Sequence, residues 1–465
     1  MDKDQVDNLR KNIQKKSSLI WDVLSEIEIS EVLKMGEEYK SFLDSSKTER
    51  EAVITILDKA KQKGFKEQKH QKIYQIHRNK CMALAVIGDT PITDGINIIA
   101  AHIDSPRIDF KQNPIYEEDN LVLSKTHYYG GIRKYHWLAR PLAIHGRLIL
   151  KDGKEVDIVI GEKIDDPVFT IADLLPHLSR KLQDDKKLSE AFEGEKLNII
   201  MGSIPIAKDI EIKDRFKLSI LNYFYEKFGI IEEDFVSAEI EIVPAEKARD
   251  VGIDRSMIGG YGQDDRICAF TLLDSILSVE KPKKTAVAIF VDKEEIGSEG
   301  NTGAKSRFME DFIANLFMHA GIQVSENILR KTLMNSLAIS ADVNGALDPD
   351  YQEVHDKKNA AKLGYGVCIT KYTGSGGKSG ASDASAEYMG KIRKIFNDNN
   401  IIWQAAGLGK VDQGGGGTIA KFLAEYGMEV VDIGPSLLSM HSPFEISSKA
   451  DLYMTAKAYK AFYKL

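Results

Sequence analysis

Residues Ile96-Asn97-Ile98-Ile99-Ala100-Ala101-His102-Ile103-Asp104 decide the fold of this chain. A short apolar run, the length of a buried strand, stops abruptly at a histidine and an aspartate. Similar runs recur between stretches with helical spacing, at residues 285–291, 336–340, 401–405 and 429–433. Strands that alternate with helices predict an α/β fold, in which helices cover both faces of a central, mostly parallel sheet.

The chain before and after these runs has the spacing of helices. Up to roughly Gln75 the apolar residues alternate with acids at helical spacing, and Ser45 or Ser46 is a candidate cap for a helix over residues 53–57. Residues 448–463 predict the last helix.

The region from about Arg107 to Asp250 has a different pattern. Residues 147–150 and 156–160 flank Asp152-Gly153, a dipeptide typical of β-hairpin turns. Residues 238–243 alternate almost strictly, which predicts a half-exposed strand, whereas residues 215–228 have helical spacing. For 465 residues, two domains are expected. We predict one from residues 1–106 and 251–465, and a β-rich inserted domain at residues 107–250.

Composition excludes several classes of protein. The net charge of -7 argues against a nucleic-acid partner, which requires a basic face. The apolar runs are too short to span a bilayer, so no membrane segment is expected. The first residues lack a signal-peptide pattern, and the three cysteines contain no CxxC. A cytoplasmic location is therefore expected.

Acidic residues and histidines stand where the predicted elements begin or end. In open α/β sheets, ligands gather at the carboxyl ends of strands. Carboxylates that converge there repel one another unless cations cancel their charge. The residues in these positions are His102, Asp104, Asp264, Glu294, Glu295, Asp342 and His441.

This set of residues suits zinc, because imidazole nitrogen and carboxylate oxygen are normal zinc ligands. Two zinc ions a few ångströms apart generate a nucleophilic water at neutral pH. One carboxylate must then bridge the ions, while another, which binds no metal, accepts the proton of the water. The adjacent pair Glu294-Glu295 fits a division into base and ligand, because neighbouring side chains point in different directions. Mn²⁺ and Co²⁺ are compatible with the same ligands.

Each motif alone also has a purely structural interpretation. His102 has the features of a core histidine, Asp264-Asp265 of a helix cap, and Glu294-Glu295 of a solvated charge run. Their occurrence together, each at the end of an element, favours the metal site.

Two glycine-rich stretches require separate interpretation. Gly374 to Ser379 resembles a phosphate-binding loop, but Tyr372 stands where that pattern requires glycine, so the match fails. A flexible loop over the active site is expected instead, with Lys371 or Lys378 reaching an acidic group of the substrate. Gly414 to Gly417 precede a helix, and either bring its N-terminus to the substrate backbone or form a plain turn.

Five segments closely resemble the signatures of the aspartyl aminopeptidase / aminopeptidase I family of zinc exopeptidases. The likeness covers essentially the whole chain and includes residues 126–131. The segments are Ala101-His102-Ile103-Asp104-Ser105-Pro106, Gly262-Gln263-Asp264-Asp265-Arg266, Glu294-Glu295-Ile296-Gly297-Ser298, Ser340-Ala341-Asp342 and Met440-His441-Ser442.

The resemblance implies a role for each site residue. Asp264 would bridge two zinc ions, Glu294 would be the general base, and Asp104 would hold the His102 ring in its ligating orientation. The terminal ligands would be His102, Glu295, Asp342 and His441. Many relatives have Asn where this chain has Asp265, which leaves open whether Asp265 supports a ligand or caps the helix.

The resemblance also implies an activity and an assembly. The substrates would be peptides with a free N-terminus, with Asp or Glu favoured as the N-terminal residue in some members. The inserted domain would pair subunits within a homododecamer built from dimers. It would also supply a histidine to the oxyanion of a neighbouring active site, for which His177 matches better than His127.

Three other functions remain as alternatives. A different two-metal exopeptidase or a deacylase uses the same kinds of ligand, although the insertion between His102 and Asp264 favours the aminopeptidase. A non-catalytic, self-assembling homologue is opposed by the presence of all five ligands. An ATPase is supported only by the likeness of Gly374 to Ser379 to a phosphate-binding loop, and that match fails.

Overall fold

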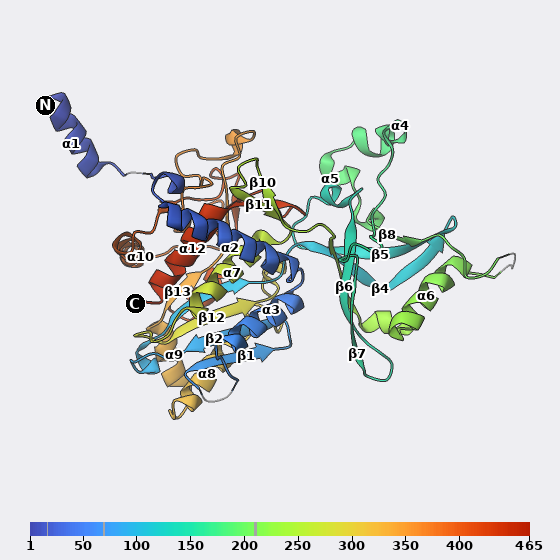
Figure 1. The fold of residues 1–465 in the computed structure, drawn as a ribbon, viewed down its shortest axis with the longest axis horizontal. Coiled ribbons are helices and arrows are strands. Elements are labelled where there is room, and N and C mark those ends of the chain that lie inside the picture. The colour runs from blue at the N-terminus through green and yellow to red at the C-terminus, as the bar shows by residue number, and fades with distance from the viewer. Residues whose placement is uncertain (16, 68–69, 209–211) are drawn as a thin grey trace.

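The computed structural model of the chain describes residues 1–15, 17–67, 70–208 and 212–465, and an eight-stranded sheet forms the centre of its larger part (Figure 1). Four neighbouring strands, β12, β3, β13 and β19, are parallel, whereas β1, β2 and β15 each have an antiparallel neighbour. The order is β1 (Lys72–His77), β2 (Cys81–Val86), β12 (Ala286–Val291), β3 (Asn97–His102), β13 (Leu337–Ser340), β19 (Glu429–Gly434), β15 (Val367–Thr370) and β17 (Trp403–Ala405). The predicted α/β fold is confirmed.

Helices bury both faces of this sheet, which explains why its strands are continuously apolar. Ile99 and Ala101 of β3 belong to one core cluster, and the alternating residues Ile98 and Ala100 belong to the other. The first cluster includes α2 (Glu26–Asp44), α3 (Glu49–Gln62), α7 (Gln263–Leu277), α10 (Ala386–Asp398) and α12 (Lys449–Phe462). The second includes α8 (Phe308–His319), α9 (Glu326–Met334) and α11 (Ala420–Ala424).

The N-terminal segment differs from its prediction in two details. The helical segment ends earlier than Gln75, because β1 begins at Lys72. Thr48, rather than Ser45 or Ser46, caps α3: its side chain accepts the N–H of Glu51, and the Glu51 side chain bonds back. This reciprocal pair of hydrogen bonds is a capping box. Helix α1 (Lys3–Ile13) stands apart from the rest and buries no residue (Figure 1).

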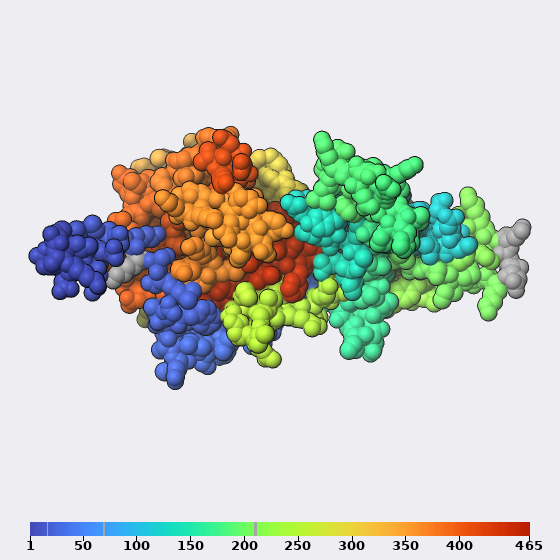
Figure 2. Space-filling view, turned by 90° about the horizontal axis from the view of Figure 1, so that it is seen from above, coloured from blue at the N-terminus to red at the C-terminus, as the bar shows by residue number. Residues whose placement is uncertain are grey.

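A six-stranded antiparallel sheet with its own core lies beside the larger part (Figures 1 and 2). The predicted hairpin is present, with Ile144 opposite Ile160, and α6 (Arg215–Phe228) packs on the sheet. The order is β7 (Glu155–Ile160), β6 (Leu142–Ile149), β9 (Glu239–Pro244), β4 (Arg107–Glu118), β5 (Leu121–Tyr129) and β8 (Ile199–Gly202).

Strand β9 is more buried than its alternation predicts. It pairs with a strand on each side, and Glu241 is only 5% exposed. The carboxylate of Glu241 lies 3.2 Å from Nε of Arg107, on the neighbouring strand β4. The polar residue at position 241 thus gives β9 the sequence pattern of a half-exposed strand, although the ion pair with Arg107 allows Glu241 to be buried.

His145 joins the six-stranded sheet to α3. Its Nδ1 lies 2.7 Å from Oε1 of Glu51, and its Nε2 lies 3.0 Å from Oε1 of Glu162. Two lysines, Lys47 and Lys247, also face Glu162. Burial alone would lower the pKa of His145, but the hydrogen bonds to the two glutamates outweigh burial and raise it.

This contact predicts a pH-dependent stability. The contribution of His145 is complete below its unfolded pKa of about 6.5, and is lost as pH rises through the higher folded pKa. His145→Gln should therefore cost about 3 kcal/mol at pH 6 and less at pH 9. Thermal unfolding midpoints at both pH values measure the difference, with His319→Gln as the control. An equal cost at both pH values would contradict the prediction.

A five-stranded sheet lies near the carboxyl end of the central sheet. Its order is β10 (Arg249–Val251), β11 (Met257–Gly260), β21 (Glu445–Ser448), β20 (Ser436–Leu438) and β14 (Asn344–Gly345). Across the described ranges, none of the helices is both long and apolar enough to cross a membrane.

Candidate metal centre

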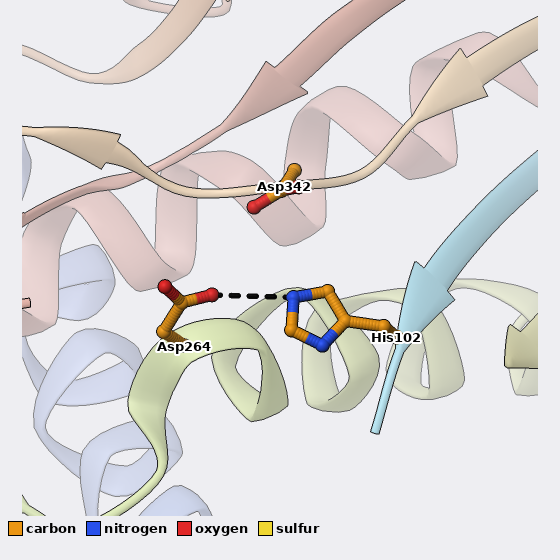
Figure 3. Close-up of side chains that lie close together, drawn as sticks. All are labelled: His102, Asp264 and Asp342. Carbon is orange, nitrogen blue, oxygen red and sulfur yellow. Dashed lines mark ion pairs between the residues drawn. The ribbon is translucent and has the colours of Figure 1, made fainter. Parts of the chain in front are cut away.

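Three residues from separate parts of the chain meet at the carboxyl end of the central sheet (Figure 3). His102 ends β3, Asp342 follows β13, and Asp264 lies at the start of α7. One ligand atom of each lies within 4.8 Å of the others. Nε2 of His102 is 3.3 Å from Oδ1 of Asp264.

A second group shares Asp264 with the first. It consists of Asp264, Glu295 and His441. Nε2 of His441 is 3.2 Å from Oδ2 of Asp264 and 3.5 Å from Oε2 of Glu295. Asp264 thus directs one oxygen toward each histidine, the arrangement that a bridging carboxylate requires.

The electrostatics of both groups favour cations. Oδ1 of Asp264 and Oε1 of Glu295 are buried without a hydrogen-bond partner in the described part of the chain. Burial, with the neighbouring carboxylates, raises the pKa of Glu295 and of Asp342 well above the usual range. Cations between these groups would satisfy the orphaned oxygens and cancel the repulsion. Imidazole and carboxylate ligands fit zinc.

Both histidine rings are held by their other nitrogen. Nδ1 of His102 lies 3.1 Å from the backbone oxygen of Asp104 and 3.2 Å from its Oδ1. Nδ1 of His441 lies 2.9 Å from the carbonyl oxygen of Gly131. Hydrogen bonds at Nδ1 leave Nε2 of each ring free to bind a metal.

Glu445 supports the site but was not predicted from the sequence. Its carboxylate accepts the backbone N–H of His441 at 2.8 Å and that of Asp264 at 3.1 Å. The only sequence signal is an acid that stands alone, four residues after His441, at the start of β21.

The two adjacent glutamates occupy different positions. Their backbone N–H groups donate to the Asp104 carboxylate, at 3.1 Å from Glu294 and 3.2 Å from Glu295. Within the described chain, Glu294 belongs to neither metal group, although it lines the same cavity. Burial and the neighbouring carboxylates of Asp104 and Asp264 raise the pKa of Glu294 to about 7.

The centre opens into a cavity of about 730 Å³. Both glycine-rich stretches line it and pair with each other, as β16 (Gly374–Ser375) and β18 (Gly415–Gly416). Lys371 and Lys378 also line it, and each forms an ion pair with Asp383, at 2.5 Å and 2.7 Å.

Of the three remaining candidates, two histidines lie away from the centre, whereas Asp265 directly follows Asp264. His177, on α4 (Pro176–Ser179), and His127 are exposed, and neither lines the cavity. Asp265 is fully buried. Asp264 and Asp265 have non-helical backbone angles at the start of α7, and neither carboxylate oxygen of Asp265 has a hydrogen-bond partner in the described chain, so its side chain does not cap the helix.

Comparison with known proteins assigns the chain to a family. The family model "Aminopeptidase I zinc metalloprotease (M18)" matches residues 42–463. A probable M18 family aminopeptidase 1 from Borreliella afzelii is 53% identical over 453 residues, which cover 96% of this chain and 98% of the relative.

Solved structures agree with this assignment. The crystal structure of an M18 family aminopeptidase from Thermotoga maritima has a TM-score of 0.93 and 49% identity, and covers 97% of this chain and 100% of that one. Aminopeptidase I from Clostridium acetobutylicum has a TM-score of 0.90 and 46% identity, covering 97% and 99%. The chain therefore belongs to the aminopeptidase I (M18) family of zinc metalloproteases and is a zinc-dependent aminopeptidase.

Proposed function

We propose that this aminopeptidase hydrolyses the N-terminal peptide bond with two zinc ions. The observation that carries the proposal is the sharing of Asp264 between two groups that each contain one histidine and one further carboxylate. His102 and Asp342 would hold one ion with Asp264, whereas His441 and Glu295 would hold the other. The ions would supply Lewis acidity and an activated water.

The chain's own residues then move the proton. We propose that Glu294, beside the ligands but outside both groups, takes a proton from the attacking water and passes it to the leaving amine. Asp104 would fix the His102 ring and, through the backbone, the position of Glu294.

The charges around the cavity favour an acidic N-terminal residue of the substrate. Beyond the proposed ligands and Glu294, four lysines and two aspartates line the cavity in the described chain. Lys371 and Lys378 share the single carboxylate of Asp383, so this loop retains one uncompensated positive charge. The charged lining residues are Asp356, Lys371, Lys378, Lys410, Lys421 and Asp432.

Lys371→Met should therefore lower kcat/KM for Asp- and Glu-peptides about fivefold, the effect of about 1 kcal/mol from a solvent-exposed charge pair. Turnover of Leu-peptides should not change. Fluorogenic aminoacyl substrates with Asp, Glu, Leu and Lys measure the preference, and exposed Lys357→Met is the control. An equal loss on Asp- and Leu-substrates would contradict the acidic preference. Faster turnover of N-acetylated substrates would instead indicate a deacylase.

We further propose that residues 107–250 are an inserted dimerisation domain of a homododecamer, and that residues 1–106 and 251–465 form the catalytic domain. Among similar folds, the yeast mApe1 dodecamer is 20% identical with a TM-score of 0.74. Leu175, Leu178 and Leu182 are exposed at helical spacing around His177. They would cover a neighbouring subunit and bring His177 to its active site. Light scattering of the purified chain measures the assembly.

A further inference from the structure

The end of strand β5 contacts the supports of both candidate metal-binding histidines. Tyr129, its last residue, donates its hydroxyl to Oδ2 of Asp104 at 2.8 Å. Two residues later, the carbonyl oxygen of Gly131 lies 2.9 Å from Nδ1 of His441. One short segment of the six-stranded sheet thus reaches across to the metal centre.

Asp104 is the point through which Tyr129 acts. In the described chain its carboxylate is completely buried and has four hydrogen-bond partners, among which Tyr129 is the only side chain from the six-stranded sheet. Oδ1 lies 3.2 Å from Nδ1 of His102 and accepts the N–H of Glu294 at 3.1 Å. Oδ2 accepts the Tyr129 hydroxyl and, at 3.2 Å, the N–H of Glu295. The orientation of this carboxylate therefore fixes a histidine ring and the backbone of both glutamates.

The Tyr129 ring is itself clamped in place. The Arg107 guanidinium carbon lies 3.9 Å from the ring centre, a cation–π contact. Arg107 is 7% exposed and is held by Asp109, at 2.8 Å from its Nε, and by Glu241, at 3.2 Å. Burial and the Asp104 carboxylate raise the pKa of Tyr129 far above its usual value, which keeps the hydroxyl protonated as a donor.

We propose that Tyr129 is a positioning residue for zinc binding. It holds the Asp104 carboxylate against the His102 ring and so connects the 107–250 region to the metal centre. The proposal rests on the proposed function, because it requires that His102 be a zinc ligand. Without the hydroxyl, Oδ2 of Asp104 keeps only the backbone donor, so the carboxylate and the His102 ring are less restrained. Loss of an outer partner of a metal-binding histidine weakens metal binding about 10–100-fold. Tyr129 acts through that partner, Asp104, so its loss should have an effect at the lower end of this range.

Tyr129→Phe tests the proposal, because it removes only the hydroxyl and keeps the ring beneath Arg107. Tyr128→Phe is the matched control, because Tyr128 is 43% exposed and its side chain makes no hydrogen bond in the described structure. Zinc affinity of the full-length apoproteins is measured by competition with a chromophoric chelator. We expect an about 10-fold weaker zinc site in Tyr129→Phe and no change in Tyr128→Phe.

Further measurements separate positioning from general damage. The visible spectrum of the Co²⁺-loaded protein should shift in Tyr129→Phe, whereas the apo form should still unfold cooperatively, at a midpoint lowered only by the loss of one buried hydrogen bond. Wild-type affinity in Tyr129→Phe, together with loss of zinc in His102→Ala, would overturn the positioning role and leave the metal site intact. Wild-type affinity in His102→Ala would overturn the metal assignment, and the role of Tyr129 with it.

Discussion

Glu294→Gln is expected to retain both zinc ions and to lose about 10²–10⁴-fold in kcat, the usual contribution of a general base. Glutamine fills the same space but cannot accept the proton of the attacking water. Zinc content is expected to be unchanged, because Glu294 belongs to neither metal group in the described chain. Elemental analysis and steady-state kinetics on one preparation measure both quantities.

Glu299→Gln is the matched control for this experiment. Glu299 lies five residues further on, is exposed, and pairs with Lys305 rather than with the centre. It should retain both zinc and activity. Near-normal turnover of Glu294→Gln would show that another group is the base, whereas loss of zinc from this variant would show that Glu294 is a ligand.

Much of the fold follows from the sequence because the central strands are buried on both faces. Strand β3 and its parallel neighbours therefore read as continuous apolar runs, and their ends carry the polar residues. Patterns within one segment could not show contacts between segments. Glu241 occupies a position that the alternating pattern assigns to the surface, yet it is buried in an ion pair with Arg107 on the neighbouring strand.

The supports of the centre show the same limit. Tyr129 and Asp104 are 25 residues apart, and Glu445 and Asp264 are 181 apart. Nothing in the local patterns of Tyr129 and Glu445 distinguishes them from ordinary polar residues. The candidate ligands and Asp104 were recognisable because each lies where an element ends or begins, whereas Tyr129 and Glu445 act on them only through the folded structure.

Asp264→Ala is expected to lose both zinc ions and all measurable activity. Each oxygen of Asp264 faces a different histidine, at 3.3 Å from Nε2 of His102 and 3.2 Å from Nε2 of His441. Its removal therefore takes one ligand from each ion, whereas Asp342→Ala takes a ligand from one group only and should retain one zinc. Zinc per chain after dialysis distinguishes these outcomes.

The loss of zinc in this variant has to be distinguished from a loss of stability. Although burial acts in the opposite direction, the hydrogen bonds of His102 and His441 hold the pKa of Asp264 below its usual range, so its removal also takes a partner from both rings in the apoprotein. Asp264→Ala should therefore unfold cooperatively at a midpoint somewhat below that of chelator-treated wild type. Asp274→Asn, on the same helix and paired with Lys460, should bind both ions. Two zinc ions in Asp264→Ala would contradict a shared carboxylate and with it the two-ion mechanism, because no other described residue belongs to both groups.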